Sequence, residues 1–167
     1  GLVGGPMFES LTLEEALRCV ERYLPYWPIC AAKALYLGAS VEDIYQRNRV
    51  DKFFLNAIKR VVDSYKGLEA GSYDLEELKI LGFSDAQIAK AWKKPVDEVR
   101  RARRAPVVKK IDTLAGEWPA DTNYLYLTYG GQYDDETPRA DFLVVGAGVF
   151  RIGVSVEFDW ATVNLAK

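Results

Sequence analysis

Apolar residues recur at intervals of three and four through the first part of the chain, the spacing of helices that bury one face. Glycine, proline or a capping residue separates each periodic segment from the next. The predicted helices cover residues 10–24, 29–37, 41–47, 51–65, 74–81, 84–92 and 95–102. The sequence therefore predicts a mainly α structure, a bundle of short helices.

Several of these segments begin with a residue that suits a helix N-terminus. Thr12, Ser40 and Asp51 are expected to cap the helices that follow them, and Asp74 starts another. The run Ser84-Asp85-Ala86-Gln87 matches a capping box, in which two side chains satisfy the free amides of the first turn reciprocally.

The pattern changes after Pro106. Residues 123–129 alternate aromatic and aliphatic side chains of high strand propensity, which predicts a strand or extended segment. A polar turn region follows over 130–139. The apolar run 142–145 then predicts a buried strand, and 155–160 the start of a helix. We expect a short α/β fragment that begins a parallel sheet.

The loop between that strand and that helix holds the candidate site residues. Gly146, Gly148 and Gly153 do not match the Gly-x-Gly-x-x-Gly of dinucleotide folds, because the third glycine comes too late. Arg151 can bind an anion through its guanidinium, next to the positive end of the helix. Glu157 stands at the start of the helix, where the simpler interpretation is that it complements the helix dipole.

Composition and charge narrow the chemistry. The 167 residues include 22 basic and 24 acidic side chains, a formal net charge of −2, which gives no general attraction to nucleic acid or to an anionic membrane. No histidine is present, so imidazole-based triads and histidine-ligated zinc are excluded. No apolar run approaches the roughly 20 residues of a membrane-spanning helix. Cys19 and Cys30 lie in apolar helical segments without metal-ligand spacing, which favours buried free thiols in a reducing compartment over a disulfide.

A weak internal repeat suggests a second type of function. Leu37-Gly38-Ala39-Ser40 and Leu81-Gly82-Phe83-Ser84 share the pattern Leu-Gly-x-Ser, and each leads into a pair of short helices that resembles a helix-turn-helix. The second pair ends in arginines (Arg100, Arg101, Arg103 and Arg104), so a DNA-binding module is the alternative hypothesis. The same signature also simply marks a helix stop followed by a helix start.

Aromatic residues are dense in the helical part. Core packing is the favoured interpretation, and an interface is the alternative. The residues concerned are Tyr23, Tyr26, Trp27, Tyr36, Phe53 and Phe54.

Three separated motifs, in order, resemble the large chain of carbamoyl phosphate synthase: Leu81–Ala89, Lys110–Tyr129 and Gly146–Trp160. That family makes carbamoyl phosphate from bicarbonate, ATP and ammonia or glutamine, for pyrimidine and arginine synthesis. It uses two ATP-grasp halves, between which lies a helical oligomerisation domain. The resemblance implies that 10–139 are this connecting domain with an extended C-terminal segment. Residues 140–167 would be the first strand, loop and helix of a truncated pre-ATP-grasp domain.

The resemblance also implies roles and partners. Arg151 and Glu157 would face the internal route of carbamate, whereas the ATP and magnesium ligands lie in other parts of the family chain. The fragment is therefore expected to hold no cofactor or metal and to be inactive alone, although the parent is an ATP-dependent ligase. Expected partners are the rest of the synthase, its glutaminase subunit or domain, and a second copy of the chain. Nucleic acid and membranes are not expected partners.

Three further expectations concern place and length. The family is cytoplasmic, and mitochondrial in some members. Residues 1–9 are expected to be a tag or linker. Between Arg103 and Pro106 the family usually has a few more residues, which this sequence lacks either by deletion or by omission.

Overall fold

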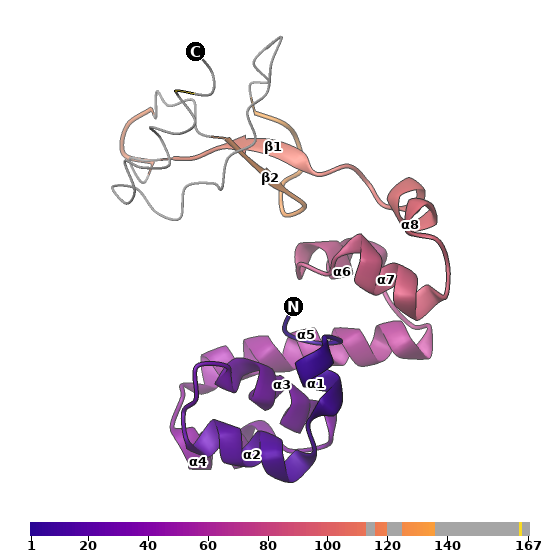
Figure 1. Cartoon of the computed structure of the whole chain (residues 1–167). Coiled ribbons are helices and arrows are strands. Elements are labelled where there is room, and N and C mark those ends of the chain that lie inside the picture. The colour runs from indigo at the N-terminus through magenta and orange to yellow at the C-terminus, as the bar shows by residue number, and fades with distance from the viewer. Residues whose placement is uncertain (113–115, 120–124, 136–163, 165–167) are drawn as a thin grey trace. The chain divides into compact units, whose positions relative to one another are not determined.

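The computed structural model describes residues 1–112, 116–119, 125–135 and 164 (Figure 1). The chain divides into two compact units, Gly1–Arg104 and Ala105–Lys167. The expected strand at 142–145 and the glycine-rich loop after it lie outside the described residues.

The first unit is helical, and its eight helices follow one another with short connections (Figure 1). Their bounds are α1 Pro6–Ser10, α2 Leu13–Glu21, α3 Trp27–Tyr36, α4 Val41–Asn48, α5 Lys52–Ala70, α6 Leu75–Ile80, α7 Asp85–Trp92 and α8 Val96–Ala102. The predicted bundle of short helices is confirmed, and α1 is an addition to it.

The helix starts are those that the capping residues predict. Thr12, Ser40 and Ser84 each form a capping box with the third residue of the helix that follows. Asp51 and Asp74 accept hydrogen bonds from amides in the first turns of α5 and α6. Each such cap satisfies amides that no residue within the helix can reach, and contributes about 1 kcal/mol.

The central element of the first unit is α3, which packs between α2 and α5. Every residue from Cys30 to Leu35 is buried. Most of these side chains are small, so α2 and α5 can approach the α3 backbone closely. Larger apolar side chains fill the remaining space, and the biggest fully buried ones are Ile44, Leu55, Leu68, Leu78 and Ile88.

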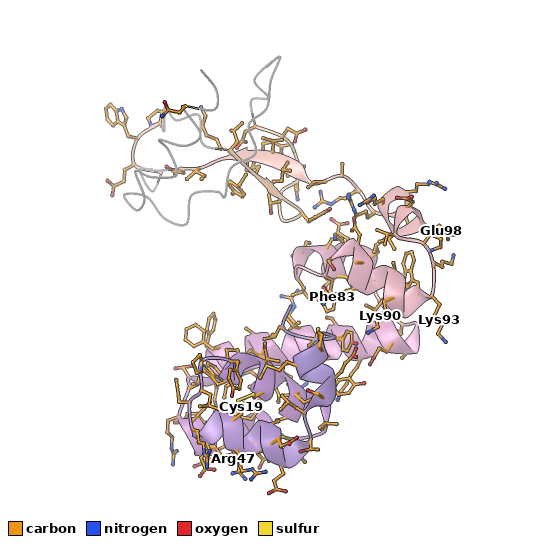
Figure 2. The ribbon with its side chains drawn as sticks, viewed as in Figure 1. Cys19, Arg47, Phe83, Lys90, Lys93 and Glu98 are labelled. Atoms are coloured by element: carbon orange, nitrogen blue, oxygen red, sulfur yellow. A yellow bond between two sulfur atoms is a disulfide. The ribbon has the colours of Figure 1, made fainter. Side chains whose placement is uncertain are left out.

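Four aromatic rings and one lysine attach α1 to this core. We call them the aromatic core cluster: Phe8, Lys33, Tyr36, Tyr65 and Phe83. Phe8 lies 5.3 Å from Tyr36 and 5.8 Å from Tyr65, centroid to centroid, in edge-to-face geometry. The ammonium of Lys33 lies 4.9 Å from the Phe8 centroid. Phe83, labelled in Figure 2, stacks on Tyr65 at 6.4 Å. The cluster therefore joins α1, α3, α5 and the turn before α7.

The N-terminal residues take part in this packing. The sequence predicts a tag or linker over residues 1–9, whereas the structure buries Val3 and Phe8, which are 2% and 3% exposed. The carboxylate of Glu9 also pairs with Lys90 of α7 at 2.7 Å. Phe8 lies before the first predicted helix, and its burial depends on contacts with Tyr36 and Tyr65, which are distant in sequence.

Cys19 and Cys30 form a disulfide between α2 and α3, seen beside the Cys19 label in Figure 2. This corrects the prediction of free thiols, and the reducing compartment inferred from it loses its basis. A short turn joins α2 to α3, and the two helices pack against each other. The Cα atoms of Cys19 and Cys30 are therefore 6.1 Å apart, within the range that a disulfide spans. The sequence shows the spacing of the cysteines but not this approach.

The described part of the second unit contains two strands, β1 (Val107–Lys110) and β2 (Leu125–Thr128), paired antiparallel. Val107 lies opposite Thr128, and Lys110 lies opposite Leu125. The predicted strand at 123–129 is thus confirmed at β2. The sequence does not predict β1, because this strand is short and half of it is the charged pair Lys109 and Lys110.

Acidic side chains occupy the outer edge of β1. The Val108 amide donates to Asp134 Oδ1 at 2.7 Å, and the Lys110 amide donates to Asp135 Oδ2 at 2.8 Å. The Asp135 amide in turn donates to the Val108 carbonyl at 2.8 Å. Lys109 pairs with Asp135, so the charge of this carboxylate is balanced. The Val108 amide and carbonyl and the Lys110 amide are therefore satisfied without another strand.

Candidate interaction surface

Five large aromatic side chains are exposed on the first unit: Tyr73, before α6, and a set of four made of Tyr23, Tyr26, Phe53 and Phe54. Phe53 and Phe54 are 74% and 58% exposed, and their rings meet edge to face at 5.3 Å. Tyr23 and Tyr26 are 55% and 43% exposed. We call this set the aromatic end.

These residues lie at one end of the unit because four helix ends meet there. Tyr23 and Tyr26 are in the turn from α2 to α3, and Phe53 and Phe54 are in the first turn of α5, directly after α4. An ion pair between Glu21 and Arg47, at 3.7 Å, joins the last turn of α2 to the last turn of α4. Figure 1 shows the α2–α3 turn and the start of α5 on the same side of the bundle.

Local backbone geometry directs the side chains outward. Tyr23 and Arg49 have left-handed backbones, with φ of 55° and 57°, which end α2 and α4 abruptly. The Asp51 carboxylate then accepts a hydrogen bond from the Phe53 amide at 2.7 Å and starts α5 at once. The apolar face of α5 begins with the buried Leu55, so the two phenylalanines before it point away from the core.

Two basic side chains near the aromatic end, Arg47 and Lys52, are paired with carboxylates of the chain. Lys52 binds Glu42 at 2.6 Å, and the hydrogen bond from Lys52, helped by one from Gln46, lowers the pKa of Glu42. The Arg49 guanidinium and the Lys52 ammonium lie 5.3 Å and 4.7 Å from the Tyr45 centroid. Exposed aromatic rings are enriched in protein interface cores, so the rings are the part of this surface that resembles an interface.

Core packing is therefore the wrong prediction for the four residues of the aromatic end. Trp27 and Tyr36 are partly buried and pack against the core, as predicted. Helical spacing fails to separate the two groups, because Phe54 and Leu55 are adjacent and only the position of α5 decides which one faces inward. The exposure of two adjacent phenylalanines in the structure indicates an interface, which their spacing in the sequence does not.

Three of the four arginines of the DNA-binding hypothesis, Arg100, Arg103 and Arg104, lie in ion pairs within the first unit. Arg103 Nε binds Asp85 at 3.0 Å, and Arg104 pairs with Glu76 at 3.1 Å. Arg100 pairs with Asp97 at 3.1 Å. Guanidinium groups already neutralised by carboxylates gain little from phosphates, because those pairs would first have to break. The repeated Leu-Gly-x-Ser pattern marks helix ends, since Gly38 and Gly82 have φ of 104° and 88°.

Asp85 is the centre of the most buried ionic group. Lys79 donates to Asp85 Oδ1 and to the Phe83 carbonyl, each at 2.7 Å. Burial raises the pKa of Asp85, but the hydrogen bonds from Lys79 and Arg103 outweigh burial and hold the pKa below its ordinary value. The group fixes the C-terminal end of α8 to α6 and α7, and its role is structural.

The site residues predicted from sequence are outside the described part of the chain: Gly146, Gly148, Arg151, Gly153 and Glu157. Within the described residues, no group of histidine, cysteine, aspartate or glutamate side chains could hold a metal ion. A shallow groove of about 680 Å³ beside α5 and α6 is lined by mixed charges, including Lys59, Asp63 and Glu77. The helices of the described ranges are too short or too polar to cross a bilayer.

Comparison with known proteins identifies the helical unit. The family model of the oligomerisation domain of the carbamoyl-phosphate synthetase large chain matches residues 6–106. A carbamoyl phosphate synthase large chain of Pyrobaculum aerophilum is 80% identical over 166 residues, covering 99% of this chain and 16% of the relative.

More distant relatives agree. The large chains of Saccharolobus solfataricus and Pyrococcus furiosus are 51% and 47% identical, and the alignments cover 100% and 99% of this chain. The chain spans about a sixth of the length of these curated relatives, 16% to 17%. The chain belongs to the carbamoyl phosphate synthase large chain family, and its helical unit is the oligomerisation domain of that family.

Proposed function

We propose that this chain is the noncatalytic connecting segment of a carbamoyl phosphate synthase and associates with a second copy of itself through the aromatic end. The family supports an oligomerisation domain. The observation that carries the proposal is the exposure of Phe53 and Phe54 at 74% and 58% beside paired charges. Two-fold association brings like surfaces together, and internally neutralised charges remove the repulsion that would oppose it.

Sedimentation equilibrium over a dilution series tests this proposal. We expect the average mass to rise with concentration towards that of a dimer, and added salt to change the dissociation constant little, because the contact is mainly apolar. A strictly monomeric profile at the highest concentration would contradict self-association of the isolated chain.

For the parent protein we propose an ATP-dependent ligase that uses magnesium and makes carbamoyl phosphate from bicarbonate and ammonia or glutamine. Large chains named carbamoyl phosphate synthase support this proposal. Its partners would be the remaining synthetase parts and a glutaminase, in the cytoplasm, with product used for pyrimidines and arginine. In the same proposal, residues 10–139 are the connecting domain and residues 140–167 are the start of a pre-ATP-grasp domain.

The segment alone should show no turnover. Incubation with ATP, magnesium, bicarbonate and ammonia, followed by an assay for carbamoyl phosphate, should give the buffer background. Product above that background would refute the noncatalytic role.

The glycine-rich loop belongs to the proposed parent activity. We propose that Arg151 and Glu157 line the route of carbamate, with Gly146, Gly148 and Gly153 shaping the loop. In the full-length enzyme, Arg151→Ala should lower carbamoyl phosphate formation while leaving the bicarbonate-dependent ATPase largely intact. Equal loss of both activities would argue against a role in the carbamate route.

A further inference from the structure

We propose that the Cys19–Cys30 disulfide is a covalent brace of the aromatic end, and that its reduction loosens the turn that carries Tyr23 and Tyr26. The effect on self-association rests on the proposed function, whereas the effect on the turn does not. The brace adds redox control to an interaction surface.

The bridge closes the base of the turn. Cys19 lies near the end of α2 and Cys30 near the start of α3, with a sequence separation of 11. All residues that project at the tip of the turn, Tyr23 and Tyr26 among them, are inside this covalent ring. The ring therefore restricts the same residues that form one half of the aromatic end.

The turn also has backbone hydrogen bonds of its own, from the Tyr23 amide to the Val20 carbonyl at 3.2 Å and from the Ile29 amide to the Tyr26 carbonyl at 3.0 Å. Tyr23 holds a left-handed backbone, which is unfavourable for a residue with a side chain. Pro25 lacks an amide hydrogen, and the Leu24 amide reaches the Cys19 carbonyl only at 3.5 Å. The shortest hydrogen bond of the turn runs from the Trp27 amide to the Leu24 carbonyl at 2.8 Å. The rings of Trp27 and Tyr23 also pack together, with their centroids 5.7 Å apart.

The rest of the α2–α3 contact does not depend on the bridge. Val20 on α2 and Ala31 and Ala34 on α3 are fully buried, so the helices stay packed when the sulfur–sulfur bond is absent. Loss of the bridge should thus act on the turn and not on the fold of the whole unit.

Burial of the sulfurs controls how the bridge is broken. Cys30 is 0% exposed and Cys19 is 5% exposed, so a thiolate can attack only when the turn opens. A dithiol then forms a mixed disulfide with one sulfur, displaces the other as a thiolate, and leaves as its own cyclic disulfide. It supplies two electrons and two protons in all, and two cysteine thiols result. Reduction in native buffer should be slow and should become fast in denaturant.

Mass spectrometry tests the bond itself. The chain purified without reductant is denatured and alkylated before and after reduction. We expect alkylation of both cysteines only after reduction, and a mass lower by two hydrogens before it. Full alkylation without reduction would overturn the proposal.

Hydrogen exchange of the oxidised and reduced wild-type chain tests the brace. For the peptide covering residues 20–29 we expect opening to increase between about tenfold and 100-fold on reduction, the range that loop closure in a ring of this size allows. Peptides from α7 and α8 serve as an internal control and should not change. Unchanged exchange in the turn, or an equal increase everywhere, would refute a local brace.

Variants and association complete the experiment. Cys19→Ala/Cys30→Ala should reproduce the exchange of the reduced wild type, and reductant should not alter this variant. By sedimentation, reduction should weaken dimerisation of the wild type severalfold. If both forms are monomeric while the turn still loosens, the proposed self-association fails and the brace stands. If both dimerise equally while the turn loosens, the bridge does not regulate the surface.

Discussion

The first unit carries two groups of aromatic side chains that have similar composition and opposite surroundings. In the aromatic core cluster, Phe8 is covered by helices from several parts of the chain and is 3% exposed. In the aromatic end, Phe53 is 74% exposed although the buried Leu55 comes only two residues later. The difference shows that an aromatic residue is buried or exposed according to whether other helices pack over it, and not according to its residue type.

Charge is used differently in the two groups. In the core cluster, Lys33 is buried and its ammonium faces the rings of Phe8 and Tyr36 at 4.9 Å and 5.6 Å. This lysine also stands in the last turn of α3, where the helix dipole favours a cation. At the aromatic end, Lys52 stays at the surface and pairs with Glu42. The core cluster is covered within the chain, whereas the rings of the aromatic end are left exposed.

The largest expected effect is on stability, from Phe8→Ala. Removing the central ring of the core cluster should lower the free energy of unfolding by roughly 3–5 kcal/mol, because it leaves a cavity among α1, α3 and α5. Urea denaturation followed by circular dichroism measures the loss. Phe53→Ala is the matched control and should change the monomer by less than about 0.5 kcal/mol. Equal losses in both variants would erase the distinction between the groups.

The next effect is on association. Phe53→Ala/Phe54→Ala should raise the dimer dissociation constant roughly tenfold or more, because exposed aromatic anchors dominate interface energies. Ile80→Ala provides the control, since Ile80 is also exposed, on α6 away from the aromatic end. If the control weakens association as much as the double variant, another surface forms the contact.

A smaller effect is expected from Tyr36→Phe. The Tyr36 hydroxyl donates to Glu69 Oε2 at 2.8 Å and thereby joins α3 to α5. Loss of this bond should cost about 1 kcal/mol of unfolding free energy, since its surroundings are partly exposed. Tyr26→Phe is a matched change at the aromatic end and should leave stability unaltered within about 0.5 kcal/mol.

The smallest effect appears only at alkaline pH. Burial, and then the nearby Glu69 carboxylate, raise the pKa of Tyr65 to about 12 from 10.0. The fold favours the neutral phenol, so its contribution to stability is full below pH 10.0 and is lost as the pH rises towards about 12. Urea midpoints measured across this range should fall in the wild type and fall less in Tyr65→Phe. Identical slopes in both proteins would argue against burial of this phenol.

The helices were predictable because their signals are local. Thr12, Ser40 and Ser84 satisfy amides within their own first turn, so sequence alone reveals where α2, α4 and α7 begin. Gly38 and Gly82 end helices through a backbone conformation that glycine adopts freely. No distant contact is needed for any of these decisions.

The interaction surface and the disulfide were not predictable because they depend on distant contacts. Whether Phe54 is buried depends on which face α5 turns to α3, and whether Cys19 meets Cys30 depends on how α2 folds back. The covering of Phe8 likewise requires α5 and the turn before α7. The resemblance to a known family supplied the oligomerisation role that helical periodicity could not, and the candidate residues around Arg151 stay a prediction.

Asp134 and Asp135 occupy one edge of β1, which limits where a further strand can pair. With the Val108 and Lys110 amides occupied by Asp134 and Asp135, a further strand cannot add beside β1 unless this loop first leaves. While this loop stays in place, a further strand can pair with these two only on the β2 side. The two carboxylates thus keep β1 an edge strand.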